Sequence, residues 1–324
     1  MLIVFSLISS AAQSAFAQQA ERADPKAAMR KITSVDNIDY EYCGKLAWLD
    51  DAYCYLLYGV DTTANVLNDL SRHEGGNQKS EASTRGRLRF GWEPRSGDFS
   101  ELDFRFRVRV KLPALEDRVE LVLSDQEDDV NQQELKAARQ DQNTNNDQAV
   151  IALQFKKNED DKVSYRVGFG RGSQLYTRAR YSDKTVFSPK STLHYFSEVN
   201  YYSSDRMGIE FSAEFGHVFN HRSAYQFNNS FRFRDRSNDW FWRHEMQVIY
   251  LGKNNTSYLA TAMIDGLSTP RYRKEQMLVS FRYKRQIYRE WLYLEVEPFV
   301  LWLRRENFRA SMGLALRAEV HFET

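Results

Sequence analysis

The chain has 324 residues and a net charge of +1, with 45 Lys and Arg against 44 Asp and Glu. This balance argues against a general nucleic-acid binder, which carries a basic excess. The mean hydropathy is −0.63. After residue 17 no apolar run approaches the ~20 residues that a membrane-spanning helix needs, so a membrane-spanning form of this chain would cross with strands.

Residues 1–17 predict a signal peptide. Leu2–Ala12 is an apolar core, and Ala15–Ala17 reads Ala-Phe-Ala, which is a cleavage site for export. No Lys or Arg precedes the apolar core, and a buried N-terminal helix is the alternative. The polar run 18–30 that follows at once favours the signal peptide, and the absence of Cys at the cleavage point disfavours a lipid anchor.

Residues 18–83 form the predicted N-terminal segment, which would lie in the periplasm. Its polar start is followed by an amphipathic helix over 47–71, which stops before Gly75 and Gly76. The apolar residues that recur at helical spacing are Leu49, Tyr53, Leu56, Leu57, Val60, Ala64, Leu67 and Leu70.

The chain has 2 cysteines, Cys43 and Cys54, and both lie in this N-terminal segment. In an exported protein a disulfide between them is the simplest expectation, and two free thiols are the alternative. Closing a loop of about 12 residues would contribute roughly 3 kcal/mol by lowering the entropy of the unfolded chain. No paired histidines accompany the cysteines, so the sequence predicts no zinc site there.

From residue 84 to the end, the pattern has a period of two. In Leu102–Leu112 every second residue is apolar and those between are charged, which is typical of a strand with one apolar and one polar face. No helical pattern interrupts the series, so the strands should be antiparallel neighbours joined as hairpins. About 14 strands are expected, within a range of roughly 12–16. They cover 84–92, 101–112, 117–124, 148–156, 162–170, 174–183, 191–203, 207–218, 222–234, 239–251, 256–266, 273–287, 290–303 and 307–322.

This alternation fits both a soluble β-sandwich and a transmembrane barrel. The predicted strands are long, whereas soluble strands average about 5–6 residues and transmembrane strands need about 9–11. Closure also removes exposed sheet edges. The predicted fold class is therefore all-β, a closed antiparallel transmembrane β-barrel over 84–324 preceded by a short periplasmic helix. Aromatic residues gather near the strand ends, as in interfacial girdles: Trp92, Tyr201, Tyr202, Trp240, Trp242, Trp302 and Phe308.

The chain resembles the outer-membrane β-barrel proteins of Gram-negative bacteria, and in particular porin-like members of that class whose activity is not characterised. The resemblance depends on the signal peptide, the even series of amphipathic hairpins and the last strand, whose apolar face is Leu314, Leu316, Val320 and Phe322. In that class the last strand usually ends on an aromatic residue that the outer-membrane assembly machinery recognises, whereas here Glu323 and Thr324 follow Phe322. The resemblance implies an outer-membrane location, with membrane lipid and lipopolysaccharide as neighbours, and it concerns architecture rather than activity.

An even strand count places both chain ends on one side of the membrane, which the export route makes the periplasm. The long insertion 124–147 follows the third strand and would then lie outside the cell. It is acidic and rich in Gln and Asn, so the sequence predicts a solvated loop. A calcium site is the alternative, although the spacing matches no calcium-binding loop.

No catalytic or cofactor motif is present: the sequence lacks G-x-S-x-G, a P-loop and H-E-x-x-H. We therefore expect no enzyme and no cofactor. His217 and His221 lie four apart at a strand end, and two solvated histidines are favoured over a metal pair. His244 falls on the nominal apolar face, near the membrane interface or at a bulge.

In a barrel the polar face lines the lumen, and its charges support two hypotheses. The first is a passive pore or conduit for polar or anionic solutes. The second is an occluded barrel with a structural, binding or lipid-modifying enzymatic role, in which Arg and Glu pair and fill the interior. The candidate lumen charge network is Arg105, Arg107, Arg109, Glu210, Glu214, Arg282, Glu295 and Arg317.

Hairpin counting gives a specific expectation within this network. A turn near Tyr288 would set Arg282 opposite Glu295, with Arg317 close by, so Glu295 should be the acceptor that two arginines share. Pro298 lacks an N–H and should mark a bulge on the same strand.

Overall fold

The computed structural model describes residues 48–70, 83–99, 101–112, 119–125, 135, 138, 150–156, 158, 161–170 and 174–323. In the described part of the chain, helix α3 (Trp48–Leu70) precedes the strands. The 3-10 turn η3 (Arg304–Glu306) lies between the last two strands. The strands are β1 (Ser83–Trp92), β2 (Leu102–Lys111), β3 (Val119–Ser124), β4 (Val150–Phe155), β5 (Val163–Gly170), β6 (Gln174–Ser188), β7 (Ser191–Tyr202), β8 (Arg206–Asn220), β9 (Ser223–Arg234), β10 (Asp239–Leu251), β11 (Thr256–Leu267), β12 (Arg273–Tyr288), β13 (Leu292–Leu303) and β14 (Ala310–Glu323).

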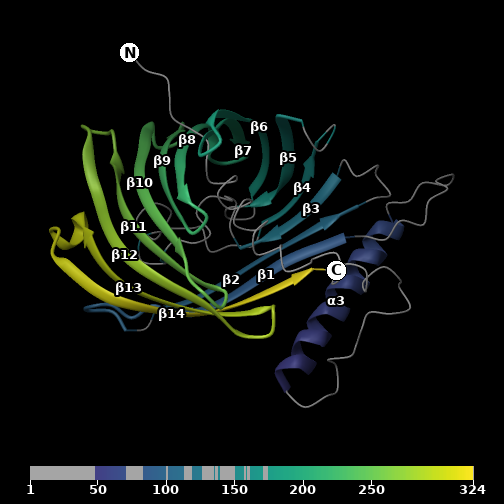
Figure 1. Cartoon of the computed structure of the whole chain (residues 1–324). Coiled ribbons are helices and arrows are strands. Elements are labelled where there is room, and N and C mark those ends of the chain that lie inside the picture. The colour runs from purple at the N-terminus through teal and green to yellow at the C-terminus, as the bar shows by residue number, and fades with distance from the viewer. Residues whose placement is uncertain are drawn as a thin grey trace.

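The strands form one closed antiparallel barrel (Figure 1), which confirms the predicted fold class. Each strand pairs with its neighbours in sequence, and β14 pairs with β1 to close the ring. The predicted strand positions are correct to within a few residues for most of the series. The largest departures are β6, which extends to Ser188, and β14, which begins at Ala310 instead of residue 307.

Closure fixes which segments share an end of the barrel. Arg85 lies opposite Glu323, and Ser83 lies opposite Lys111. The start of β1, the end of β14 and the β12–β13 turn therefore lie at one end, which we call the terminal rim. The opposite end, the distal rim, carries the β1–β2, β3–β4 and β13–β14 connections.

The two faces of the wall have opposite character. The outer face exposes large apolar side chains, among them Phe90, Leu102, Phe104, Phe169, Phe211 and Phe281. The inner face buries charged side chains, among them Arg89, Arg105, Glu198, Glu210, Arg243 and Glu297. This distribution is the reverse of that in a water-soluble protein and is typical of a barrel surrounded by lipid.

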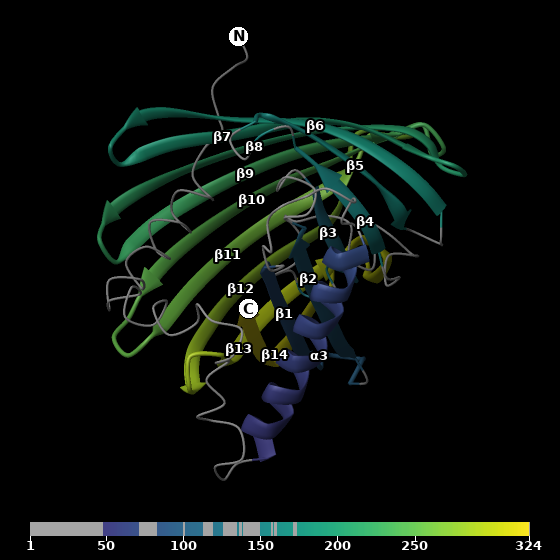
Figure 2. The same cartoon turned by 90° about the vertical axis from the view of Figure 1, so that its right-hand side faces the viewer.

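Helix α3 confirms the helix predicted over 47–71 and packs on the outside of the wall at the terminal rim (Figure 2). Ala64 is fully buried in a cluster with Val110 and Leu112, which belong to the outer face of β2 and the residue after it. Among the described helical residues, none forms a stretch long and apolar enough to span a bilayer. The predicted signal peptide and Cys43 lie outside the described residues, so the disulfide and the cleavage site stay predictions.

Candidate functional site

The best-defined cluster of charged residues lies inside the barrel, on β12, β13, β14 and β1. At its centre, the Arg317 guanidinium donates from Nε to Glu93 at 2.7 Å and from Nη1 to Glu297, and it lies 3.6 Å from Glu295. Arg282 donates to Glu297 at 2.8 Å. All five side chains are buried, and buried charges are stable only when they are paired in this way. We call these five residues the Arg317 network.

The register of the β12–β13 hairpin differs from the prediction. Lys284, not Arg282, lies opposite Glu295, at 3.3 Å from its carboxylate. The centre of the hairpin lies closer to Glu290 than the prediction placed it. An irregularity between Gln286 and Tyr288 shifts the register of the two strands next to the turn. As a result Glu297, rather than Glu295, is the carboxylate to which two arginines donate.

The predicted bulge at Pro298 is also wrong. Pairs on either side of it, such as Ser280 with Phe299 and Tyr283 with Val296, keep the same register. The lost N–H of proline interrupts the ladder there without adding a residue to it. Lys284 links the network to the terminal rim because it also lies 3.0 Å from Glu319, which Arg87 approaches at 3.6 Å.

A second group is an arginine ladder on β1 and β2. The register places Arg85 opposite Arg109, Arg87 opposite Arg107, and Arg89 opposite Arg105. Like charges directly opposite each other on one face destabilise a strand pair. Asp103 partly offsets this at one end of the ladder, since it lies 3.3 Å from Arg89 and 2.9 Å from Arg105.

The ladder has a counterpart on the next long strands of the wall, where Arg166 lies opposite Arg178 on β5 and β6. Arg178 and Arg180 both approach Glu198, at 3.4 and 2.6 Å. Arg166 donates from Nε to the amide oxygen of Gln154 at 3.2 Å. Cations therefore lie close together on this side of the lumen, and Arg178 and Arg180 share the carboxylate of Glu198.

The structure divides the eight predicted lumen residues into three places. Arg282, Glu295 and Arg317 come together in the Arg317 network. Arg105 is adjacent to it, because Asp103 pairs with both Arg105 and Arg89. Arg107 and Arg109 belong to the arginine ladder. Glu210 and Glu214 lie on β8 across the barrel, where Glu210 pairs with Arg232 at 3.0 Å.

The sequence reasoning missed Glu93, Asp103, Lys284 and Glu297 as members of these groups. Asp103 has the parity of Arg105, and Glu93 continues the parity of Arg85, Arg87 and Arg89 past the end of β1. Asp103 lies within β2, so its parity alone places it in the lumen, and extending the alternation of β1 past Trp92 would have placed Glu93 there as well.

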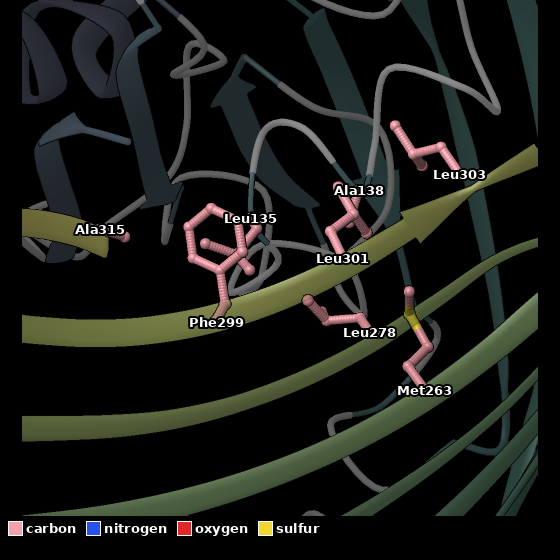
Figure 3. Close-up of a cluster of buried hydrophobic side chains, with 8 residues drawn as sticks. All are labelled: Leu135, Ala138, Met263, Leu278, Phe299, Leu301, Leu303 and Ala315. Carbon is pink, nitrogen blue, oxygen red and sulfur yellow. The ribbon is translucent and has the colours of Figure 1, made fainter. Parts of the chain in front are cut away.

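An apolar cluster covers the lumen side of β11–β14 between the Arg317 network and the distal rim (Figure 3). Its members on the wall share the parity of the lumen charges: Met263, Leu278, Phe299, Leu301, Leu303 and Ala315. Leu135 and Ala138, which belong to the long insertion, are buried against them. Gln276 fixes this contact, since its amide donates to the Ala138 carbonyl at 2.6 Å and to Asp265 at 2.7 Å.

At Leu135 and Ala138 this contact corrects the prediction that 124–147 is a solvated loop, and 126–134, 136–137 and 139–147 lie outside the described residues. Two apolar residues of the insertion pack inside the barrel instead of facing water. Burial also decreases along the lumen: Arg317 and Leu301 are fully buried, whereas the Lys284 side chain near the terminal rim is 23% exposed. On this side of the lumen, the described charges near the terminal rim are therefore more exposed than those at the centre of the Arg317 network.

One histidine joins these groups near the terminal rim, since Nε2 of His321 lies 2.6 Å from Glu319, whereas His217 and His244 have other partners. His217 is hydrogen-bonded through Nδ1 to Ser191 at 2.8 Å, and His244 lies on the outer face, where Nδ1 is 2.6 Å from the side-chain oxygen of Asn229. Within the described ranges, no group of three or more His, Cys, Asp or Glu could hold a metal ion.

No protein-family model matches the chain, and no curated protein matches its sequence. Among solved structures, the outer membrane channel DcaP of Acinetobacter baumannii is similar with 8% identity and a TM-score of 0.48, over 78% of this chain and 99% of that one. OccK11 of Pseudomonas aeruginosa has 9% identity and a TM-score of 0.44, over 75% and 96%. The KdgM porin in complex with disordered oligogalacturonate has 7% identity and a TM-score of 0.36, over 73% and 99%. We take no function from likenesses this distant.

Proposed function

We propose that this chain is an outer-membrane β-barrel whose lumen takes up anionic solutes. The observation that carries the proposal is the arginine ladder, in which three successive lumen-facing positions of β1 lie opposite arginines of β2. Carboxylates also reach the β1 arginines, with Glu323 at 2.5 Å from Arg85, Glu319 at 3.6 Å from Arg87 and Asp103 at 3.3 Å from Arg89, but the facing arginines still bring six cations onto two adjacent strands. An anion between the two strands would relieve the repulsion between them.

Arginine is also the side chain best suited to this role. Its planar guanidinium stays charged and binds carboxylates and phosphates through two parallel hydrogen bonds. Opposed Cβ atoms in an antiparallel pair are about 5 Å apart, so two facing guanidinium groups can reach the same anion. The ladder is thus suited to bind solutes that carry carboxylate, phosphate or sulfate groups.

The outer-membrane location is supported by the apolar outer wall, together with the predicted signal peptide. With an even number of strands, the terminal rim would face the periplasm and the distal rim the cell exterior. The end of the lumen that holds Lys284 and Arg87 would then open to the periplasm.

Ion conductance across a planar bilayer tests this proposal. Purified protein should produce single-channel currents, and a salt gradient should give a reversal potential that indicates preference for chloride over potassium. Currents that prefer cations would contradict anion uptake through the lumen.

An occluded barrel is the second candidate, and the apolar cluster favours it. Leu135 and Ala138 pack in one cluster with Phe299 and Leu301 inside the lumen, near the distal rim. If this contact persists in the membrane, the lumen is a blind chamber that binds anions from the terminal rim. Saturable binding of an anion without any current would indicate the chamber. Phospholipid or lipopolysaccharide hydrolysis that is lost on His194→Ala or His244→Ala would instead indicate an enzyme.

A further inference from the structure

Helix α3 exposes an uncharged face that its packing against the barrel leaves uncovered. Trp48, Ala52, Tyr55, Gly59 and Thr62 recur at steps of three and four residues, so they share one side of the helix. All five are exposed, and Trp48 and Tyr55 have relative exposures of 77% and 78%. Two largely exposed aromatic rings on one side of a helix indicate a surface that contacts something other than water.

The opposite side of the helix is tightly held. Near its start, Asp50 accepts hydrogen bonds from Arg289 at 2.8 Å and from the Tyr288 hydroxyl at 3.0 Å. Tyr53 stacks on Trp291 with ring centroids 4.5 Å apart and an interplanar angle of 5°. Farther along, Ala64 is buried on Val110 and Leu112. The helix therefore joins the β12–β13 turn to β2 and crosses the seam where β14 meets β1.

The helix lies across the strands at the terminal rim, outside the wall (Figures 1 and 2). In a barrel that spans a bilayer, this places the helix axis along the membrane surface. The outer wall at the same rim is apolar as well, with exposed Ile287, Tyr250 and Phe219. The uncharged face of α3 continues that surface outward from the wall.

Charges occupy a different flank of the helix. At 100° per residue, Asp51 and Asp61 fall between the barrel-facing side and the uncharged side. The helix thus has three sides: one against protein, one uncharged with Trp and Tyr, and one acidic. Trp and Tyr are the residues that favour the headgroup region of a membrane, and acidic groups favour water.

We propose that the uncharged face of α3 lies in the headgroup region of the leaflet beside the terminal rim, so that α3 anchors this rim at a fixed depth. The inference rests on the proposed membrane location. Lipid fits this face better than a second protein copy because the face lies at the same rim as the apolar outer wall that lipid would surround. The face also consists of the aromatic rings of Trp48 and Tyr55 at the level of the membrane surface, whereas a protein partner would favour a hollowed apolar patch.

Tryptophan quenching tests the proposal on the full chain, reconstituted in vesicles of phosphatidylethanolamine and phosphatidylglycerol. The contribution of Trp48 is the difference between the wild type and Trp48→Phe, each shown to be folded by its heat-modifiable migration on a gel. Lipid brominated near the headgroup should quench this contribution, and aqueous iodide should leave it largely unchanged. Should Trp48→Phe not fold, Trp48→Tyr gives the same difference with a residue that suits the interface.

Trp92 on the outer wall is the control, since it is 44% exposed and belongs to β1. If brominated lipid quenches the Trp92 contribution but not that of Trp48, the barrel is in the membrane and the proposal for α3 is wrong. If it quenches neither, the membrane location itself fails. Shielding of Trp48 from both lipid and iodide would mean that protein covers this face, which also overturns the proposal.

Discussion

Arg317 of β14 donates to Glu93, the residue that follows β1, at 2.7 Å, and both side chains are fully buried. This ion pair joins the last strand to the first from inside the lumen, next to the seam that α3 crosses on the outside. The closure of the barrel is therefore supported on both faces.

Replacing Arg317 with Met should strongly destabilise the barrel. The change leaves Glu93, Glu295 and Glu297 buried together without their common partner, and an orphaned buried charge costs about 3–5 kcal/mol. The temperature at which the protein loses its compact form on a gel should fall markedly. Arg85→Gln is the matched control, because Arg85 pairs with Glu323 across the same seam at 74% and 56% exposure. An equal loss of heat stability in the two variants would show that burial does not increase the contribution of the Arg317 ion pairs.

Glu297→Gln should destabilise the protein more than Glu295→Gln. Glu297 accepts from Arg282, Arg317 and the Ser280 hydroxyl, whereas Glu295 lies at 3.3 Å or more from its cations. Hydrogen bonds to charged groups contribute about 1.5–3 kcal/mol each, so the difference should be measurable in denaturant unfolding. The opposite order would mean that the register places Glu295 at the centre.

Leu135→Asp should increase conductance if the apolar cluster restricts the lumen. A carboxylate cannot remain in contact with Phe299 and Leu301 without a partner, so the contact should open. Single-channel current measures the result. Leu294→Asn on the outer wall is a control for general destabilisation and should leave the current unchanged. A current that is the same in wild type and Leu135→Asp would show that the cluster does not limit passage.

The link between α3 and the β12–β13 turn can be measured with a double-mutant cycle. Asp50→Asn and Arg289→Gln should each destabilise the helix contact, and the double variant should cost less than the sum. The hydrogen bond to Asp50 raises the pKa of Arg289. The Arg289 guanidinium is therefore charged at neutral pH. Hydrogen exchange of the 48–65 amides reports the effect. Strict additivity would show that the two residues do not interact in the membrane.

Strand positions and faces could be predicted because a period of two is a local property. Arg282, Glu295 and Arg317 were assigned to the lumen from parity alone, and the structure places all three there. Which of them pair could not be predicted in the same way. Pairing depends on the turn length and on the irregularity near Ile287, and neither leaves a mark in the alternation.

The inward packing of Leu135 was also missed. One leucine in a polar segment resembles a solvated loop residue, and only its partners reveal the contact. A signal was present in the wall itself, since Leu278, Phe299, Leu301 and Leu303 are apolar at positions whose parity belongs to the polar face. Such a break in the polar face indicates that something apolar covers it.

The reversal potential of the arginine-ladder variant tests the central claim most directly. Arg87→Gln combined with Arg107→Gln removes one cross-strand pair, and Lys253→Gln in the exposed β10–β11 turn removes a cation outside the lumen. In a salt gradient across a planar bilayer, we expect wild type and Lys253→Gln to prefer anions and the double variant to lose most of that preference. An unchanged reversal potential in the double variant, or a preference for cations in the wild type, would contradict anion uptake by the ladder.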